Sequence, residues 1–111
     1  MSDDICALLM ERSKSEPFGK MLDMPVVEAR PGFARIRMTV KPEFANLFGS
    51  MHGGALFALM DEAFQVACNT HGELAVALNV SITYVAAPQI GSILEATARE
   101  IYKTRRTASY L

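Results

Sequence analysis

The chain has 111 residues, of which 50% are hydrophobic and 21% are charged, and its formal net charge is −1. This size is typical of one domain with one core, and we expect residues 1–111 to form a single domain. The charge balance leaves no positive excess for a nucleic-acid backbone, and no apolar run approaches the ~18 residues that span a bilayer. We therefore expect neither nucleic-acid nor membrane partners. An acidic start and two widely separated cysteines, Cys6 and Cys68, predict a reduced, cytoplasmic protein.

Apolar residues at helical spacing predict a helix over residues 3–14, which is ended by Pro17. Two strands are expected next, over residues 24–30 and 34–40, joined by a Pro-Gly turn. The second strand alternates apolar and polar residues. One of its faces should therefore pack on a core while the other is in contact with water.

A loop over residues 41–54 leads into a long helix over residues 54–69. This helix has almost no polar face, which is typical of a helix that is buried on most sides. Three strands are expected after it, over residues 75–85, 92–102 and 106–111. One helix among several antiparallel strands is an α+β arrangement. The last strand is expected to be cut short at Leu111, so that a sheet edge there must be covered.

Two glycines, Gly53 and Gly54, open the long helix. The N–H groups of a first helical turn have no partners within the helix and lie at the positive end of its dipole. Such a site can hold an anion, or an oxygen that becomes anionic during a reaction. The alternative interpretation is that the glycine pair only lets the chain turn tightly into the helix.

Asp61 lies among apolar residues of the same helix. A carboxylate in such surroundings pairs with another group, binds a metal or takes part in acid–base chemistry. A structural ion pair and a catalytic role both remain open on the spacing alone. Glu62 points about 100° away round the helix, and we expect it to face solvent or a neighbouring subunit.

The spacing of these groups bears on the number of chains in a site. Asp61 follows Gly54 by seven residues, which places the two on nearly the same helix face but ~10 Å apart along the axis. Reacting groups must come within about 3–3.5 Å of each other. If Gly53 and Asp61 serve one reaction, they most simply come from two chains across a two-fold axis. A catalytic role therefore implies a homodimer with paired sites at its interface.

Other reactive groups give weaker indications. Cys68 and His71 could form a thiolate–imidazole pair, although a cysteine in an apolar helix more often packs inertly. With two histidines and no close cysteine pair, no metal site is expected. Lys103, Arg105 and Arg106 crowd a turn, where solvated charge is the default interpretation and contact with ligand phosphates is the alternative.

One loop and the helix after it carry a distinctive pattern: Asn46-x-x-Gly49-x-x-His52-Gly53-Gly54, with Asp61 eight positions beyond Gly53. This pattern resembles the active-site signature of hotdog-fold acyl-CoA thioesterases, and most of all that of the phenylacetate-degradation (PaaI-like) type. Residues 79–88 also resemble the family's strand after the helix. The resemblance implies a curved antiparallel β-sheet wrapped around a long central α-helix. It further implies homodimers that often assemble into homotetramers.

The resemblance also implies an activity: hydrolysis of an acyl- or aryl-CoA thioester to a carboxylate and coenzyme A. The backbone N–H of Gly53 would polarise the thioester carbonyl, and Asp61 of the other subunit would act as general base or as nucleophile. Asn46 would help to position the water or the acyl group, and His52 would order the loop or bind near the carbonyl. No metal or other cofactor is implied, because coenzyme A is part of the substrate.

The coenzyme A moiety would lie along the subunit interface, and Gly54 and Phe57 are among the expected substrate-binding residues. The phosphates of coenzyme A would meet Lys103, Arg105 or Arg106. Some related enzymes carry a water-orienting Ser or Thr where this chain has Ala77, and Asn79 or Ser81 would substitute for it. The candidates for the acyl pocket are Phe48, Met51, Phe57, Met60 and Phe64.

Two other functions would fit the same fold. A non-catalytic module could bind acyl-CoA without hydrolysing it. An acyl-CoA hydratase would need an Asp and a His close together in the loop before the helix, whereas Asp61 lies two turns inside the helix. Members of the family usually continue through another strand beyond the position of Leu111, so the C-terminal strand of this hotdog domain is expected to be truncated.

Overall fold

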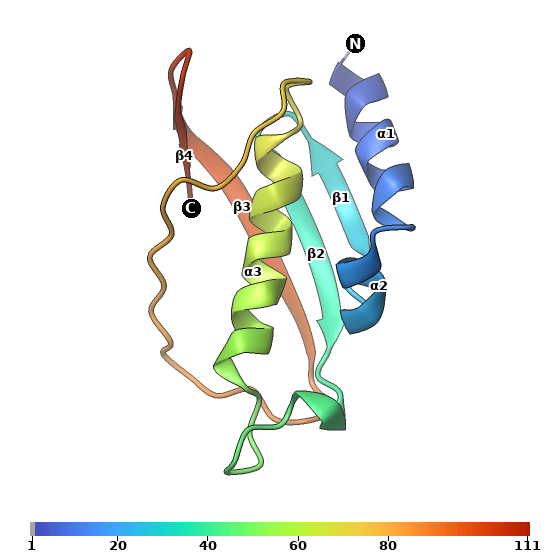
Figure 1. Ribbon diagram of the computed structural model, residues 1–111, viewed down its shortest axis with the longest axis vertical. Helices are drawn as coiled ribbons and strands as arrows, with labels where there is room; N and C mark the ends of the chain where they lie inside the picture. Colours follow the sequence, from blue (N-terminus) through green and yellow to red (C-terminus); the bar gives the residue numbers. More distant parts are fainter. Residues whose placement is uncertain (1) are drawn as a thin grey trace.

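Residues 2–111 are described by a computed structural model, in which a four-stranded sheet packs against one long helix (Figure 1). In chain order the elements are α1 (Ser2–Ser13), α2 (Pro17–Leu22), β1 (Val26–Arg30), β2 (Phe33–Thr39), the 3-10 helix η1 (Pro42–Phe44), α3 (Gly53–Cys68), β3 (Ile93–Lys103) and β4 (Ala108–Tyr110). The strand order is β1-β2-β3-β4, and every neighbouring pair is antiparallel. This arrangement confirms the predicted α+β class.

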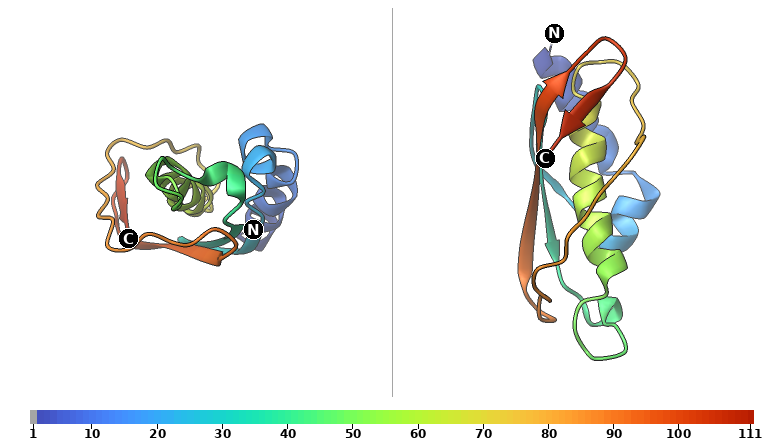
Figure 2. Two further views of the ribbon diagram at one scale, coloured as in Figure 1. Left: turned by 90° about the horizontal axis from the view of Figure 1, so that it is seen from below. Right: turned by 90° about the vertical axis from the view of Figure 1, so that its left-hand side faces the viewer.

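The sheet curves toward α3 at its β4 edge. Seen along the helix, α3 has the sheet on one side, β4 on a second side, and α1 and α2 opposite β4 (Figure 2). The pairing of β3 with β4 shifts register between Glu100 and Tyr102, and an irregularity of this kind bends a strand and increases its twist. Phe64 of α3 meets Tyr110 of β4 edge-on, with 5.6 Å between ring centroids. The sheet therefore encloses part of α3.

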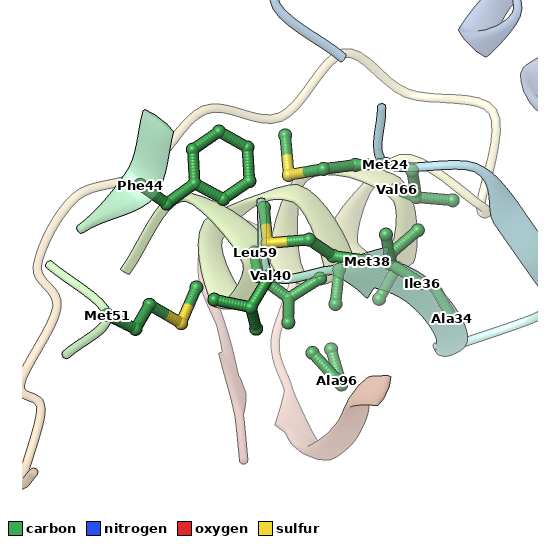
Figure 3. Close-up of a cluster of buried hydrophobic side chains, with 13 residues drawn as sticks. Met24, Ala34, Ile36, Met38, Val40, Phe44, Met51, Leu59, Val66 and Ala96 are labelled. Atoms are coloured by element: carbon green, nitrogen blue, oxygen red, sulfur yellow. The ribbon is translucent and has the colours of Figure 1, made fainter. Parts of the chain in front are cut away.

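The hydrophobic core fills the space between β2 and α3. The alternating residues of β2 that were expected to face a core are buried, and Ile36 and Met38 have no exposed surface. Leu59 of α3, which is 1% exposed, packs in the same cluster (Figure 3). Burial of this apolar surface holds α3 on the sheet, and it fixes which face of the helix is left for other contacts.

Residues 75–85 do not form the predicted strand. They follow an extended path outside the sheet, on the β4 side of α3 (Figures 1 and 2). An isolated strand needs a sheet edge of similar length for its backbone hydrogen bonds, and β4 offers three residues. The apolar side chains of this segment consequently lack cover: Leu78 is 86% exposed and Val85 is 90% exposed.

The N-terminal third holds one helix that the sequence analysis did not predict. The first helix ends at Ser13, close to its expected end, but Pro17 begins α2 instead of marking only a stop. Proline suits the first helical position, because its missing N–H would have no intrahelical partner there. The strands at residues 24–30, 34–40 and 92–102 are confirmed within two residues, whereas β4 is shorter than expected.

Glu62 is buried, contrary to the prediction that it faces solvent or a neighbouring subunit. Its side chain is on the α3 face that α2 covers, and the residue is 4% exposed. A Cβ placed on Gly19 would lie 3.1 Å from Oε2 of Glu62 and 2.6 Å from Oε1 of Glu16, so the two carboxyl groups meet beneath α2. Desolvation, then hydrogen bonding to Glu16 and its charge, raise the pKa of Glu62 to about 8. The Glu16–Glu62 pair therefore retains a proton at neutral pH.

Within residues 2–111, no helix combines the length and the apolar character required to cross a membrane.

The Glu16–Glu62 pair predicts that the fold becomes less stable as pH rises. Because burial raises the pKa of Glu62 from 4.5 to about 8, its stabilising contribution is complete below pH 4.5 and is lost as pH rises through 8. We expect the free energy of unfolding, measured with urea, to fall by about 2–4 kcal/mol between these limits.

Glu62→Gln keeps a hydrogen-bond donor opposite Glu16 and cannot ionise, so its free energy of unfolding should change far less over that range. Glu43→Gln, at an exposed position of η1, is the matched control and should follow the wild type. A wild-type stability that stays constant or rises from pH 5 to pH 8 would contradict the assignment.

Candidate functional site

The loop before α3 is held in shape by Asn46. Its side-chain oxygen accepts hydrogen bonds from the backbone N–H groups of Phe48, at 2.8 Å, and Ser50, at 3.1 Å. The Asn46 N–H donates to the carbonyl of Ser50 at 2.7 Å, and an isolated bridge pairs Ala45 with Met51. These bonds return the chain to the start of α3 in a fixed direction. Asn46 therefore orders the loop that leads to the predicted site.

His52 caps the N-terminus of α3. Its Nδ1 accepts a hydrogen bond from the backbone N–H of Gly54 at 2.8 Å, and its own N–H donates to the carbonyl of Phe44. A side-chain acceptor at this position satisfies one of the donors that a helix leaves free. Because Nδ1 accepts, the proton of the neutral imidazole lies on Nε2. Exposed His52 thus presents an N–H donor at the helix start.

The backbone N–H of Gly53 has no acceptor among residues 2–111. The next three N–H groups are all engaged, since Gly54 donates to the His52 ring and both Ala55 and Leu56 donate to the His52 carbonyl. The Gly53 donor also lies at the positive end of the dipole of α3. It is therefore the group of this turn that can polarise a ligand oxygen.

Tyr84 lies against Gly53 and was not predicted as a site residue. Its hydroxyl donates to the carbonyl oxygen of Gly53 at 3.2 Å, and its ring is 3.4 Å from the position that a Cβ on Gly53 would take. Tyr84 is the last residue in the apolar alternation of residues 75–85. This alternation gave no indication that the Tyr84 side chain would contact Gly53.

Asp61 lies in the middle of α3 and is half-buried. Its side chain has no hydrogen-bonding or ion-pair partner within residues 2–111, so no structural ion pair of this chain accounts for it. Asp61 lies eight positions after Gly53 in the helix, which corresponds to ~12 Å along the axis. A single chain therefore does not bring the two groups together, as the sequence spacing indicated.

The predicted substrate contacts are distributed over the length of α3. Gly54 is exposed at the helix start, and Phe57 is half-buried one turn further on. Asn79 and Ser81 are exposed on the unpaired segment. The basic turn lies at the opposite end of α3 from Gly53 (Figure 1). There, Arg105 and Arg106 line a surface hollow between Thr104 and Thr107, next to Lys103 at the end of β3.

The possible thiolate–imidazole pair does not form. The ring of His71 lies 2.7 Å from Oε1 of Glu100, which also accepts from the hydroxyl of Tyr110 at 3.0 Å. Burial raises the pKa of the Cys68 thiol, and its Sγ contacts the carbonyl of Gln65 at 3.5 Å. Cys68 is therefore a neutral packing residue. Within the described part of the chain, no group of three or more His, Cys, Asp or Glu residues could hold a metal ion.

The sequence profile of the thioesterase superfamily matches residues 48–111, which include the signature from Gly49 onward and all of α3, whereas Asn46 lies before the matched range. The chain belongs to this superfamily. A putative esterase of Archaeoglobus fulgidus is 42% identical to it, over 88% of this chain and 64% of that protein. The acyl-coenzyme A thioesterase PaaI of Escherichia coli is 35% identical over 87% of this chain and 69% of its own length. The chain thus spans about two thirds of the length of these two curated relatives.

Solved structures agree with the sequence matches. The structure of the E. coli PaaI protein from the phenylacetic acid degradation operon has a TM-score of 0.88 and 33% identity, over 95% of this chain and 78% of that one. A hypothetical thioesterase of Streptococcus pneumoniae, solved with coenzyme A, has a TM-score of 0.75 and 25% identity, over 78% of this chain and 68% of that one. The predicted hotdog fold and PaaI-like resemblance of this thioesterase-superfamily chain are confirmed.

The cap at the start of α3 can be tested through stability alone. His52→Ala removes the acceptor of the Gly54 N–H and should lower the free energy of unfolding by about 1 kcal/mol, the usual effect of a lost N-cap. His52→Asn supplies a different cap without an imidazole and should restore most of that loss in urea denaturation. Equal destabilisation by both substitutions would contradict a capping role.

Proposed function

We propose that this chain carries the catalytic machinery of an acyl-CoA thioesterase, which hydrolyses an acyl- or aryl-CoA thioester to a carboxylate and coenzyme A. The observation that carries the proposal is that, among residues 2–111, the N–H of Gly53 at the start of α3 has no acceptor and Asp61 in the middle of the same helix has no partner. Superfamily membership and a relative named acyl-coenzyme A thioesterase support the reaction class. The coenzyme A in a structural neighbour supports the ligand class.

The proposed reaction begins when the thioester carbonyl accepts a hydrogen bond from the Gly53 N–H. Attack on the carbonyl carbon moves negative charge onto this oxygen, where the N–H and the helix dipole stabilise it. Asp61 either removes a proton from the attacking water or attacks directly and forms an anhydride that water then cleaves. The C–S bond breaks, coenzyme A leaves as a thiolate that takes up a proton, and the acyl group departs as a carboxylate.

The two groups of one reaction centre are proposed to come from two chains. Their separation of ~12 Å along one helix exceeds the contact that a shared water allows. When two α3 helices run antiparallel across a two-fold axis, Gly53 of one chain can face Asp61 of the other, and each chain contributes to two sites. Phe57 is midway between residues 53 and 61, so this pairing places it beside the axis, between the two sites.

Exposed apolar side chains on α3 and on the segment after it support a homodimer. Met60, next to Asp61, is 37% exposed on α3, and Leu78 and Val85 are almost fully exposed on the neighbouring segment. Large apolar side chains left exposed in this number are typical of an interaction site. The exposed backbone of residues 76–85, which lies outside the sheet, also offers N–H and C=O groups with which another strand can pair. A second copy of this chain would cover both, and pairs of dimers would give the proposed homotetramer.

The same antiparallel pairing gives the basic turn a role. Arg105 and Arg106 lie at the end of α3 opposite Gly53 within one chain. In an antiparallel dimer this end of one subunit approaches the Gly53 end of the other. The guanidinium groups could then bind the phosphates of coenzyme A, for which arginine forms bidentate hydrogen bonds.

Asp61→Asn tests the proposed chemistry. The amide keeps the shape of the side chain but neither accepts a proton nor attacks a carbonyl, so kcat should fall by roughly 10²–10⁴ with the fold intact. Release of free thiol from short-chain, long-chain and aryl-CoA esters measures the effect. Asp23→Asn, at an exposed position after α2, is the control. Near-wild-type turnover of Asp61→Asn on every hydrolysed ester would refute the role, and tight binding without any thiol release would identify a non-catalytic acyl-CoA-binding module.

Subunit complementation tests whether one site uses two chains. Gly53→Pro removes the donating N–H at a helix position that accepts proline, so this variant and Asp61→Asn should each be inactive alone. A heterodimer of the two has one site with both groups intact, and random exchange should restore up to about a quarter of wild-type activity. Mass spectrometry verifies exchange, and exchange without recovery would contradict a shared site.

A further inference from the structure

Tyr84 is fixed at the start of α3 although it belongs to a segment outside the sheet. At one end of the segment, the side chain of Asn69 bonds to the backbone of Ala75, and at the other the Pro88 carbonyl accepts from Met51. Between these ends, within the described chain, the hydrogen bond from Tyr84 to Gly53 is the attachment to α3. Tyr84 is nevertheless 50% exposed, so it contributes little to the core.

One peptide group connects Tyr84 with His52. The Tyr84 hydroxyl donates to the carbonyl of Gly53 at 3.2 Å, and the N–H of the same Gly53–Gly54 peptide donates to Nδ1 of His52 at 2.8 Å. A bond to a peptide oxygen polarises the peptide and strengthens the bond that its N–H donates. The tyrosine hydroxyl therefore acts on the imidazole through the backbone.

We propose that Tyr84 is a positioning residue for the thioester site. It holds the Gly53–Gly54 peptide in place and stabilises the His52 tautomer that accepts at Nδ1 and carries its proton on Nε2. Two donors then remain available at the helix start, the N–H of Gly53 and Nε2–H of His52. This assignment rests on the proposed function of Gly53, whereas the effect of Tyr84 on the His52 tautomer does not depend on it.

The chain offers a variant and a close control. Tyr84→Phe keeps the ring against Gly53 and removes the hydroxyl. Tyr102→Phe removes a hydroxyl from a tyrosine of β3 that is 67% exposed. Both are conservative changes on the surface, and thermal unfolding would verify that each variant is as stable as the wild type at the assay temperature.

Two measurements test the assignment. Long-range ¹H–¹⁵N spectra at about pH 8.5, above the range in which imidazoles usually titrate, report the tautomer of His52. Tyr84→Phe should increase the Nδ1–H fraction, and Tyr102→Phe should leave it unchanged. In the thiol-release assay, Tyr84→Phe should lower kcat about three- to tenfold, the equivalent of one ordinary hydrogen bond, with KM within twofold of wild type.

The outcomes separate the inference from the proposed function. A changed tautomer together with a lower kcat in Tyr84→Phe alone supports the positioning role. An unchanged tautomer overturns it, and so does a loss of kcat that Tyr102→Phe shares or that disappears at lower temperature. If the wild type releases thiol from no CoA ester, the proposed function fails, and the spectra still decide whether Tyr84 fixes the ring of His52.

Discussion

The site depends on which backbone N–H groups at the start of α3 find an acceptor and which one is left without an acceptor. A helix begins with more donors than it can use, and here the ring of His52 accepts one while its carbonyl accepts two. Within the described part of the chain the Gly53 donor remains free, because the loop closed by Asn46 brings the chain into the helix without placing an acceptor opposite it. Tyr84 then adds a bond to the neighbouring peptide. The available donor thus results from how its neighbours are satisfied.

A second constraint is the rigidity of α3. Because the helix keeps Gly53 and Asp61 ~12 Å apart, their cooperation requires a second chain, and the open surfaces lie where such a chain would sit. Asp61 is half-buried on α3, and the apolar segment after the helix runs on the β4 side, away from α1 and α2 (Figure 2). The same geometry would explain an unpaired carboxylate in the middle of an apolar helix.

The hydrophobic pattern was a reliable guide where burial within one chain decided the structure. Alternation predicted β2, whose apolar residues pack on α3, and the apolar run predicted α3 nearly to the residue. The alternation over residues 75–85 is as regular, but the strand that it predicted does not form. A strand also needs a sheet edge with which to pair, and β4 provides only three residues. The helical angle of Glu62 was correctly derived, yet its burial depended on α2, which the sequence analysis did not predict.

The sequence by itself determined the α+β class, the family resemblance, the helix with its glycine start and Asp61, and the conclusion that one helix cannot unite these two groups. All of these depend on local periodicity, on residue types or on the fixed rise of a helix. Only the tertiary structure decided that Glu62 meets Glu16, that His71 bonds to Glu100 and not to Cys68, and that Tyr84 reaches Gly53. These contacts join residues far apart in the chain, and their partners are set by how helices and strands pack, which the spacing of residues within one element does not specify.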